Sequence, residues 1–256
     1  MDVADYYRAV ASKILPYMMD RPVGVGHKSP GVFTRSLDGA GIEISSEEEL
    51  HARVEQGAVA FYVSPADRKG VVWFSLGLRA SGVPFEAVRL TALKLILVLK
   101  DVEIDGMMVF DGHGGIDLLW TWGVIDPDDL PGDIWGFQME IASALQERLE
   151  KRLFDTPERD RIGRWLGWDR EVTRFDNEGS GDGVTITLRA MSHGGLIRVP
   201  YSLNEETLRA AIPLTRNDLY RFDRDKDAEM EKAGRLRRRF ELPLNFPRFV
   251  ARALNL

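Results

Sequence analysis

The sequence predicts an α+β fold in which mixed sheets are flanked by helices. Apolar strand patterns and helical patterns alternate along its 256 residues, and two neighbouring strand patterns lie close enough to form a hairpin. A content of 44% apolar residues is enough to bury a sizeable core. The hairpin indicates antiparallel pairing, which argues against a doubly wound parallel sheet.

The first elements are two amphipathic helices followed by two strands. Apolar residues at helical spacing, with Asp2 available as a cap, predict a helix over residues 2–19. A serine followed three residues later by a glutamate predicts a capping box and a helix over residues 45–56. Apolar runs at 58–64 and 71–78 predict strands.

The remaining elements repeat this order. Pro84 opens a broadly apolar helix that extends to residue 100, and the runs MMVFDG and IDLLWTW predict the hairpin. The later expectations are a helix at 135–152, a polar loop holding Trp165 and Trp168, strands at 183–191 and 196–203, and a solvated charged helix in the tail at 223–240.

Composition limits the functional classes. A net charge of −6 provides no global attraction to nucleic acid, so such binding would need a local basic patch, and the run Arg235 to Arg239 is the only dense basic cluster. With zero cysteines there is no thiolate zinc site, disulfide or cysteine nucleophile. The N-terminus begins acidic without an apolar leader, so we expect a cytoplasmic, soluble protein without membrane contact.

Two loops carry candidate binding residues. His113 and His193 each lie beside glycines, in loops where a binding side chain is often placed. A loop histidine without a ligand remains the alternative.

Five segments occur in an order and spacing that are typical of one known family. They are DYYRAVASKILPYMMDRPV, GVVWFSLGLRASGVPFEAVRLTAL, VFDGHGGIDLL, LIRVPYSL and AAIPLT. Together they resemble the archaeo-eukaryotic primase superfamily, most closely the polymerase domain of bacterial ligase D and its stand-alone archaeal relatives. The resemblance extends from Asp2 to about Phe222. It implies one primase-polymerase domain over 1–256, with an N-terminal lobe at about 1–65, an RRM-like lobe at about 66–222 and a charged tail at 223–256.

The resemblance also shows which family residues this sequence lacks. The first catalytic strand of the family ends in Asp-x-Asp, two carboxylates that hold divalent metals, and the matching positions are Ser75 and Gly77. The third acid matches Thr187, or Ser192 at the shorter archaeal spacing. The family's triphosphate loop has lysine and histidine where this chain has Gly114 and Asp117.

The resemblance implies a primase-polymerase fold without polymerase chemistry and therefore without a cofactor. Such a protein would act as an accessory or structural subunit in DNA replication or end-joining repair, with DNA, a catalytic primase, a ligase or an end-binding protein as its partner. The residues that the resemblance suggests for phosphate or nucleotide binding are Lys13, His27, Lys28, Arg35, His113, His193 and Arg198. Solvated or structural side chains are the alternative interpretation.

Two other functions stay open. An active nucleotidyltransferase could hold Mg²⁺ or Mn²⁺ on relocated ligands, namely Asp111, Asp117 and the more distant Asp126. A protein-interaction scaffold without nucleic-acid binding would show no DNA affinity at any salt concentration, whereas a DNA-binding protein would show affinity that falls as salt rises.

Overall fold

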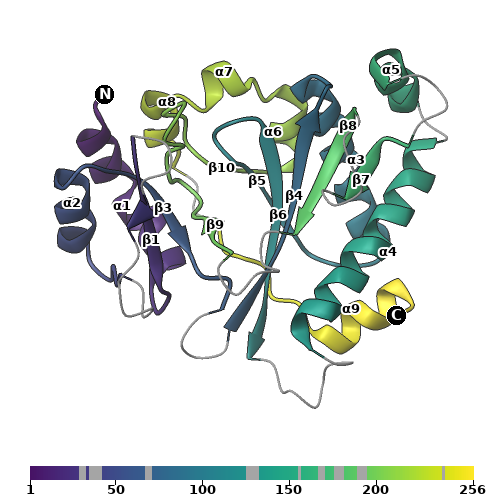
Figure 1. Ribbon diagram of the computed structural model, residues 1–256, viewed down its shortest axis with the longest axis horizontal. Coiled ribbons are helices and arrows are strands. Elements are labelled where there is room, and N and C mark those ends of the chain that lie inside the picture. Colours follow the sequence, from purple (N-terminus) through teal and green to yellow (C-terminus); the bar gives the residue numbers. More distant parts are fainter. Residues whose placement is uncertain are drawn as a thin grey trace.

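The computed structural model describes most of the chain. The described residues are 1–28, 33–34, 42–66, 71–124, 133–154, 157–166, 171–175, 182–188, 195–237 and 240–256. They form two β-sheets with helices packed around them (Figure 1). The predicted α+β fold with mixed sheets is confirmed.

A small antiparallel sheet forms the N-terminal lobe. Its strand order is β2-β1-β3-β9, with bounds β1 Val23–His27, β2 Phe33–Thr34, β3 Ala58–Val63 and β9 Ile197–Arg198. Because β9 comes from much later in the chain, the segment that follows residue 65 contributes to this lobe as well. The two lobes are therefore joined by strand pairing.

Two predicted helices accompany the small sheet. Helix α1 (Val3–Met18) begins where the Asp2 side chain accepts a hydrogen bond from the Asp5 backbone N–H at 2.7 Å. Helix α2 (Glu47–Glu55) begins with a capping box in which Ser46 and Glu49 bond to each other's backbone N–H groups. Both helices lie where the sequence places them.

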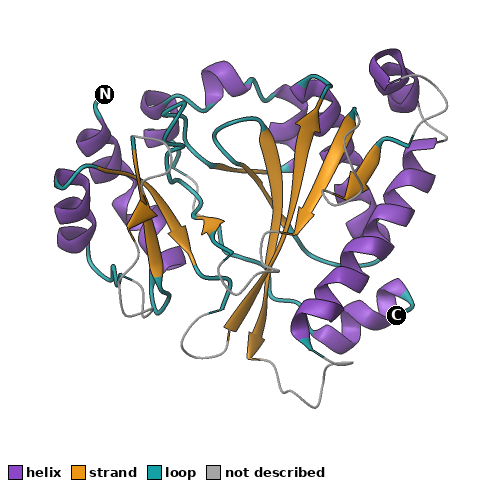
Figure 2. Cartoon of the chain, viewed as in Figure 1, coloured by secondary structure: helices purple, strands orange, loops and turns teal. Residues whose placement is uncertain are grey.

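A six-stranded sheet forms the second lobe, in the order β10-β5-β6-β4-β8-β7. Its strands are β4 Val71–Ser81, β5 Met107–Phe110, β6 Gly115–Val124, β7 Thr173–Phe175, β8 Gly183–Leu188 and β10 Ile212–Leu214. All neighbours pair antiparallel except β7 and β8, which are parallel, so the sheet is mixed (Figure 2). The predicted hairpin is β5–β6.

Helices α3 (Phe85–Asp101) and α4 (Ile134–Phe154) cover one face of this large sheet. Phe74 stacks on Trp120 with ring centroids 3.8 Å apart, and Trp122 packs against Phe137 of α4. Successive residues of a strand point to opposite faces, so Phe74 on the helix-covered face places Ser75 on the other. This other face, here called the open face, carries the candidate site.

The C-terminal segment differs from the expected solvated helix. It contains α6 (Arg216–Arg221), α7 (Arg224–Asp227), α8 (Met230–Gly234) and α9 (Pro247–Leu254). Helix α8 packs on α1, α9 packs on α4, and the backbone of Thr121 bonds to Pro243 and Asn245. Buried Ala233 and Val250 show why the charge pattern misleads: the few apolar residues of this segment cover both lobes.

Two local expectations are wrong, and one short strand was not expected. Residues 157–166 form helix α5 with a buried Ile162, so Trp165 lies on a helix and not in a polar loop, while Trp168 lies outside the described residues. The strand expected at 196–203 is reduced to β9, because Pro200 lacks a donor and Tyr201 adopts a positive φ of 69°. Strand β7 is too short for its pattern to be recognised.

Among the described residues, the apolar stretches of the helices are too short or too charged to cross a bilayer.

Candidate functional site

Strand β4 aligns the two positions that match the family's metal-binding acids. Ser75, Gly77 and Arg79 are spaced two apart, so they share the open face of the large sheet. Ser75 is fully buried, and its Oγ has no hydrogen-bond partner among the described residues. Gly77 adds no side chain to this face.

Strand pairing places Asp117 and Thr187, two further positions that the family resemblance singles out, beside Gly77. The register sets Gly77 opposite Asp117 of β6 on one side and opposite Thr187 of β8 on the other. The Thr187 Oγ1 donates to the Gly77 carbonyl at 3.3 Å. Gly77, Asp117 and Thr187 therefore lie side by side on three neighbouring strands, and Asp117 is the one acid among them.

An arginine occupies this place. Arg79 Nη2 lies 2.5 Å from Asp117 Oδ1, and Nε lies 3.2 Å from Asp111 Oδ2, close enough for an ion pair although not aligned for a hydrogen bond. Its Nη1 donates to the Leu78 carbonyl at 3.0 Å. One fixed cation thus bridges the two carboxylates that were the alternative metal ligands.

Two glycines make room for the guanidinium. A Cβ at Gly115 would lie 2.3 Å from Arg79 Nη1, and a Cβ at Gly77 would lie 3.1 Å from the same atom and 2.9 Å from Asp117 Oδ1. No side chain fits at Gly115 unless Arg79 moves. The glycines of the β4 and β6 strands are therefore part of the arginine site.

Asp111 is held in its ionised form. Its Oδ1 accepts backbone N–H groups of His113, Gly114 and Gly115 at 2.8–2.9 Å. Burial alone raises the pKa of Asp111, but Arg79 and the three N–H donors outweigh burial and hold this pKa well below its usual value. Burial likewise lowers the pKa of Arg79, and Asp117 and Asp111 more than offset this and raise it. Arg79 and Asp111 are therefore both charged at neutral pH and form an ion pair.

A cavity of about 370 Å³ adjoins the outer side of Arg79. Its lining residues are Arg79, Ala80, His113, Gly114, Thr207, Arg209 and Arg224. Arg209 pairs with Asp225 at 2.6 Å, and the Arg224 guanidinium lies over the Phe85 ring, 5.4 Å from its centroid. Asp111, Asp117 and Asp225, the acids that pair with Arg79 and Arg209, do not line the cavity. The cavity therefore presents mainly N–H donors, which suit a phosphate oxygen.

The other candidate residues are spread over the molecule. Lys13 donates to the Gly234 carbonyl, His27 Nδ1 lies 3.0 Å from the Gly57 carbonyl, and Lys28 is exposed at the end of β1. Arg35 and His193 lie outside the described residues, as do Asp126 and Ser192. Of this group, His113 alone lines the cavity beside Arg79.

Arg198 has a structural role in place of the suggested phosphate contact. Its buried guanidinium donates to Glu205 Oε2 at 2.8 Å and to the Leu203 carbonyl and Tyr62 hydroxyl, both at 2.5 Å. Because the Glu205 carboxylate already neutralises it, Arg198 fastens β9 to the loop that follows.

The described residues contain no cluster of three or more histidine and acidic side chains that could hold a metal ion. Asp111 and Asp117 lie near each other as the alternative hypothesis requires, yet Arg79 lies between them. The site residue that sequence reasoning missed is Arg79. Alternation along β4 was the signal, because it places Arg79 on the same face as Ser75 and Gly77.

The fold defines the class: the chain has the primase-polymerase fold. No family model and no curated protein matches the sequence. Among solved structures, the polymerase domain of Mycobacterium tuberculosis ligase D in complex with DNA is similar over 99% of this chain and 88% of that one, with a TM-score of 0.58 and 18% sequence identity. This likeness confirms the fold expected from the ordered segments.

Proposed function

We propose that this chain is a primase-polymerase-fold protein without nucleotidyl-transfer activity that binds DNA as an accessory subunit in replication or end-joining repair. One observation carries the proposal: Arg79 bridges Asp111 and Asp117 where the family resemblance would place metal ions.

A guanidinium cannot substitute for metal ions in this chemistry. Metals activate the attacking hydroxyl and stabilise the leaving group through coordination sites that exchange with substrate. Arg79 remains protonated and its N–H groups already point to Asp117 and the Leu78 carbonyl. Its charge instead neutralises acids that would repel a phosphate backbone.

The cavity beside Arg79 supports binding of a phosphate-bearing strand. Arg209 and Arg224 line this cavity, and their guanidinium N–H groups suit the oxygens of a phosphate. The similar ligase D domain was solved in complex with DNA, which makes DNA the first ligand to test. A catalytic primase, a ligase or an end-binding protein remains the proposed partner.

Fluorescence anisotropy with a labelled duplex bearing a single-stranded overhang tests the DNA-binding half of this proposal. We expect affinity that falls steeply as salt rises, and a loss of about tenfold, equivalent to roughly 1–2 kcal/mol, for Arg224→Ser. Arg252→Ser is the matched control, because Arg252 is exposed on α9 with no ion pair among the described residues. Equal loss in both variants would show that DNA does not bind at this cavity, and no binding at low salt would favour the protein-interaction scaffold.

A further inference from the structure

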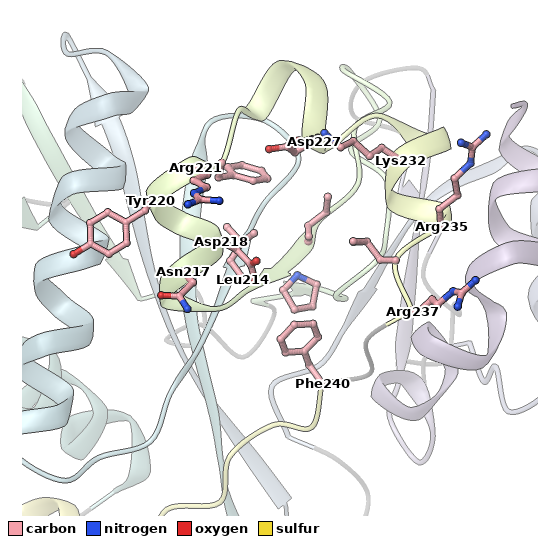
Figure 3. Close-up of a pocket in the computed structure, with 14 residues that line it drawn as sticks. Leu214, Asn217, Asp218, Tyr220, Arg221, Asp227, Lys232, Arg235, Arg237 and Phe240 are labelled. Atoms are coloured by element: carbon pink, nitrogen blue, oxygen red, sulfur yellow. Dashed lines mark hydrogen bonds and ion pairs between the residues drawn. The ribbon is translucent and has the colours of Figure 1, made fainter.

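A second cavity of about 900 Å³ lies away from Arg79, between the edge of the large sheet and the C-terminal segment. Its walls are β10, α6, residues 227–237 and Phe240, as Figure 3 shows. This volume lies within the usual range for a ligand site. The residues of the proposed DNA site do not line it.

The floor of this groove is apolar. Ile212 and Leu214 of the edge strand β10 are buried, and Leu236 and Phe240 lie beside them on the C-terminal segment. Phe240 extends toward Leu214 in the close-up view (Figure 3). Such a floor favours insertion of an aliphatic or aromatic side chain, because burying it removes apolar surface from water.

The rim of the groove carries unbalanced positive charge. Arg221 lies on α6 at one side, and Arg235 and Arg237 lie on the opposite side, where their side chains extend outward from the cavity (Figure 3). Arg235 pairs with Glu231, whereas exposed Arg221 and Arg237 form no ion pair with any described residue.

The two acids of the lining do not offset this charge. Asp218 is bound in the capping box of α6 with Thr215, and Asp227 is bound to Lys232. In a chain of net charge −6, this local excess selects an acidic partner.

The groove suits a peptide better than a nucleic acid. Bases need exposed aromatic faces for stacking, yet the exposed Tyr220 extends away from the cavity (Figure 3) and Arg216 donates to its hydroxyl. Of the two phenylalanines that line the cavity, Phe222 is buried and Phe240 is half-buried, and Ile212 and Leu214 are aliphatic, so the floor offers little ring surface for stacking bases. An apolar anchor with acidic neighbours matches both floor and rim.

We propose that this groove docks an acidic partner-protein segment that inserts an aliphatic or aromatic anchor onto Leu214 and Phe240 and places carboxylates between Arg221 and Arg237. This interaction goes beyond the proposed DNA binding and uses separate residues. It provides a surface through which an accessory subunit could be held by another protein.

The test is selection of a phage-displayed library of random 16-residue peptides on the immobilised full chain. We expect enriched peptides to combine Leu, Phe or Trp with flanking Asp or Glu. A synthetic enriched peptide should bind the double variant Arg221→Glu/Arg237→Glu at least ~10-fold more weakly, and a version with Gln in place of its acids should lose affinity likewise.

Two controls separate this site from folding and from DNA binding. Arg252→Glu, an exposed reversal on α9, should leave peptide affinity unchanged, and thermal unfolding should show that both charge variants remain folded. Arg224→Ser should also leave it unchanged, so failure of the DNA proposal does not affect this one.

Three peptide results would overturn the proposal, and so would a fourth, on self-association. They are enrichment of no peptide, enrichment of peptides that are indifferent to the double reversal, and displacement of the bound peptide by an oligothymidine of similar length. The last result would assign the groove to nucleic acid, and concentration-dependent self-association abolished by the double reversal would assign it to a second copy of this chain.

Discussion

At the residue scale, the site depends on one cation between two buried acids. The Arg79 side chain is 18% exposed, and those of Asp111 and Asp117 are 7% and 4% exposed. Removing the cation would leave two carboxylates desolvated and facing each other. Removing Arg79 should therefore lower stability strongly, even though the intact ion pair itself contributes only modestly to the free energy of folding.

Arg79→Met should therefore lower the free energy of unfolding by about 3–5 kcal/mol, the loss typical of removing one partner of a buried ion pair. Urea unfolding measures the change. Arg8→Met is the control, because the Arg8–Asp5 pair is exposed and should contribute only about 0–1 kcal/mol. A loss below ~1 kcal/mol for Arg79→Met would contradict the arginine bridge.

The depressed pKa of Asp111 makes a pH prediction with a definite sign. Its folded pKa lies below the unfolded value of 3.8, so Asp111 contributes stability above pH 3.8 that is lost as pH falls toward the folded pKa. Asp111→Asn should remove this contribution. Unfolding free energies compared between about pH 6 and about pH 3 should then fall less in the variant than in the natural chain. Equal falls would show that Asp111 is not held ionised.

At the element scale, strands β4 and β6 leave room for the Arg79 side chain because Gly77 of β4 and Gly115 of β6 both lie against it. The alternation of β4 and the hairpin β5–β6 are readable from sequence. What the sequence does not reveal is that Arg79 folds back onto Gly115, because this depends on strand register.

Gly115→Ala tests this close approach. Its Cβ would lie 2.3 Å from Arg79 Nη1, so the arginine must move and the variant should lose about 1–3 kcal/mol of stability. Gly114→Ala is the matched control: its Cβ meets only Arg224 Nη1, at 3.3 Å, and Arg224 has a flexible, partly exposed side chain. Equal effects in the two variants, measured by chemical unfolding, would mean that Arg79 does not fill the space over Gly115.

At the scale of the whole molecule, the C-terminal segment holds the two lobes together. The charge run between residues 223 and 240 predicts a solvated helix, and the error arises because charged residues set the pattern while isolated apolar residues set the packing. Tyr17 of α1 donates to the Phe240 carbonyl, and further along the chain Val250 and Leu254 are buried against the second lobe. Only the three-dimensional structure shows which surface these isolated side chains meet.

Leu254→Ala should lower stability by about 2–3 kcal/mol, as expected for a buried leucine, although Leu254 is the third residue from the end of this sequence. Leu256→Ala is the control, because Leu256 is 47% exposed. Thermal unfolding of the two variants distinguishes a docked helix from a solvated tail, for which neither change would matter.

The central claim is that Arg79 replaces metal chemistry in a primase-polymerase fold, and primer extension and primer synthesis with Mg²⁺ or Mn²⁺ and all nucleotides test it most directly. We expect no incorporation by the natural chain under conditions in which it binds DNA. Metal-dependent incorporation that is abolished by Asp111→Ala or Asp117→Ala would contradict the claim and establish an active transferase with relocated ligands.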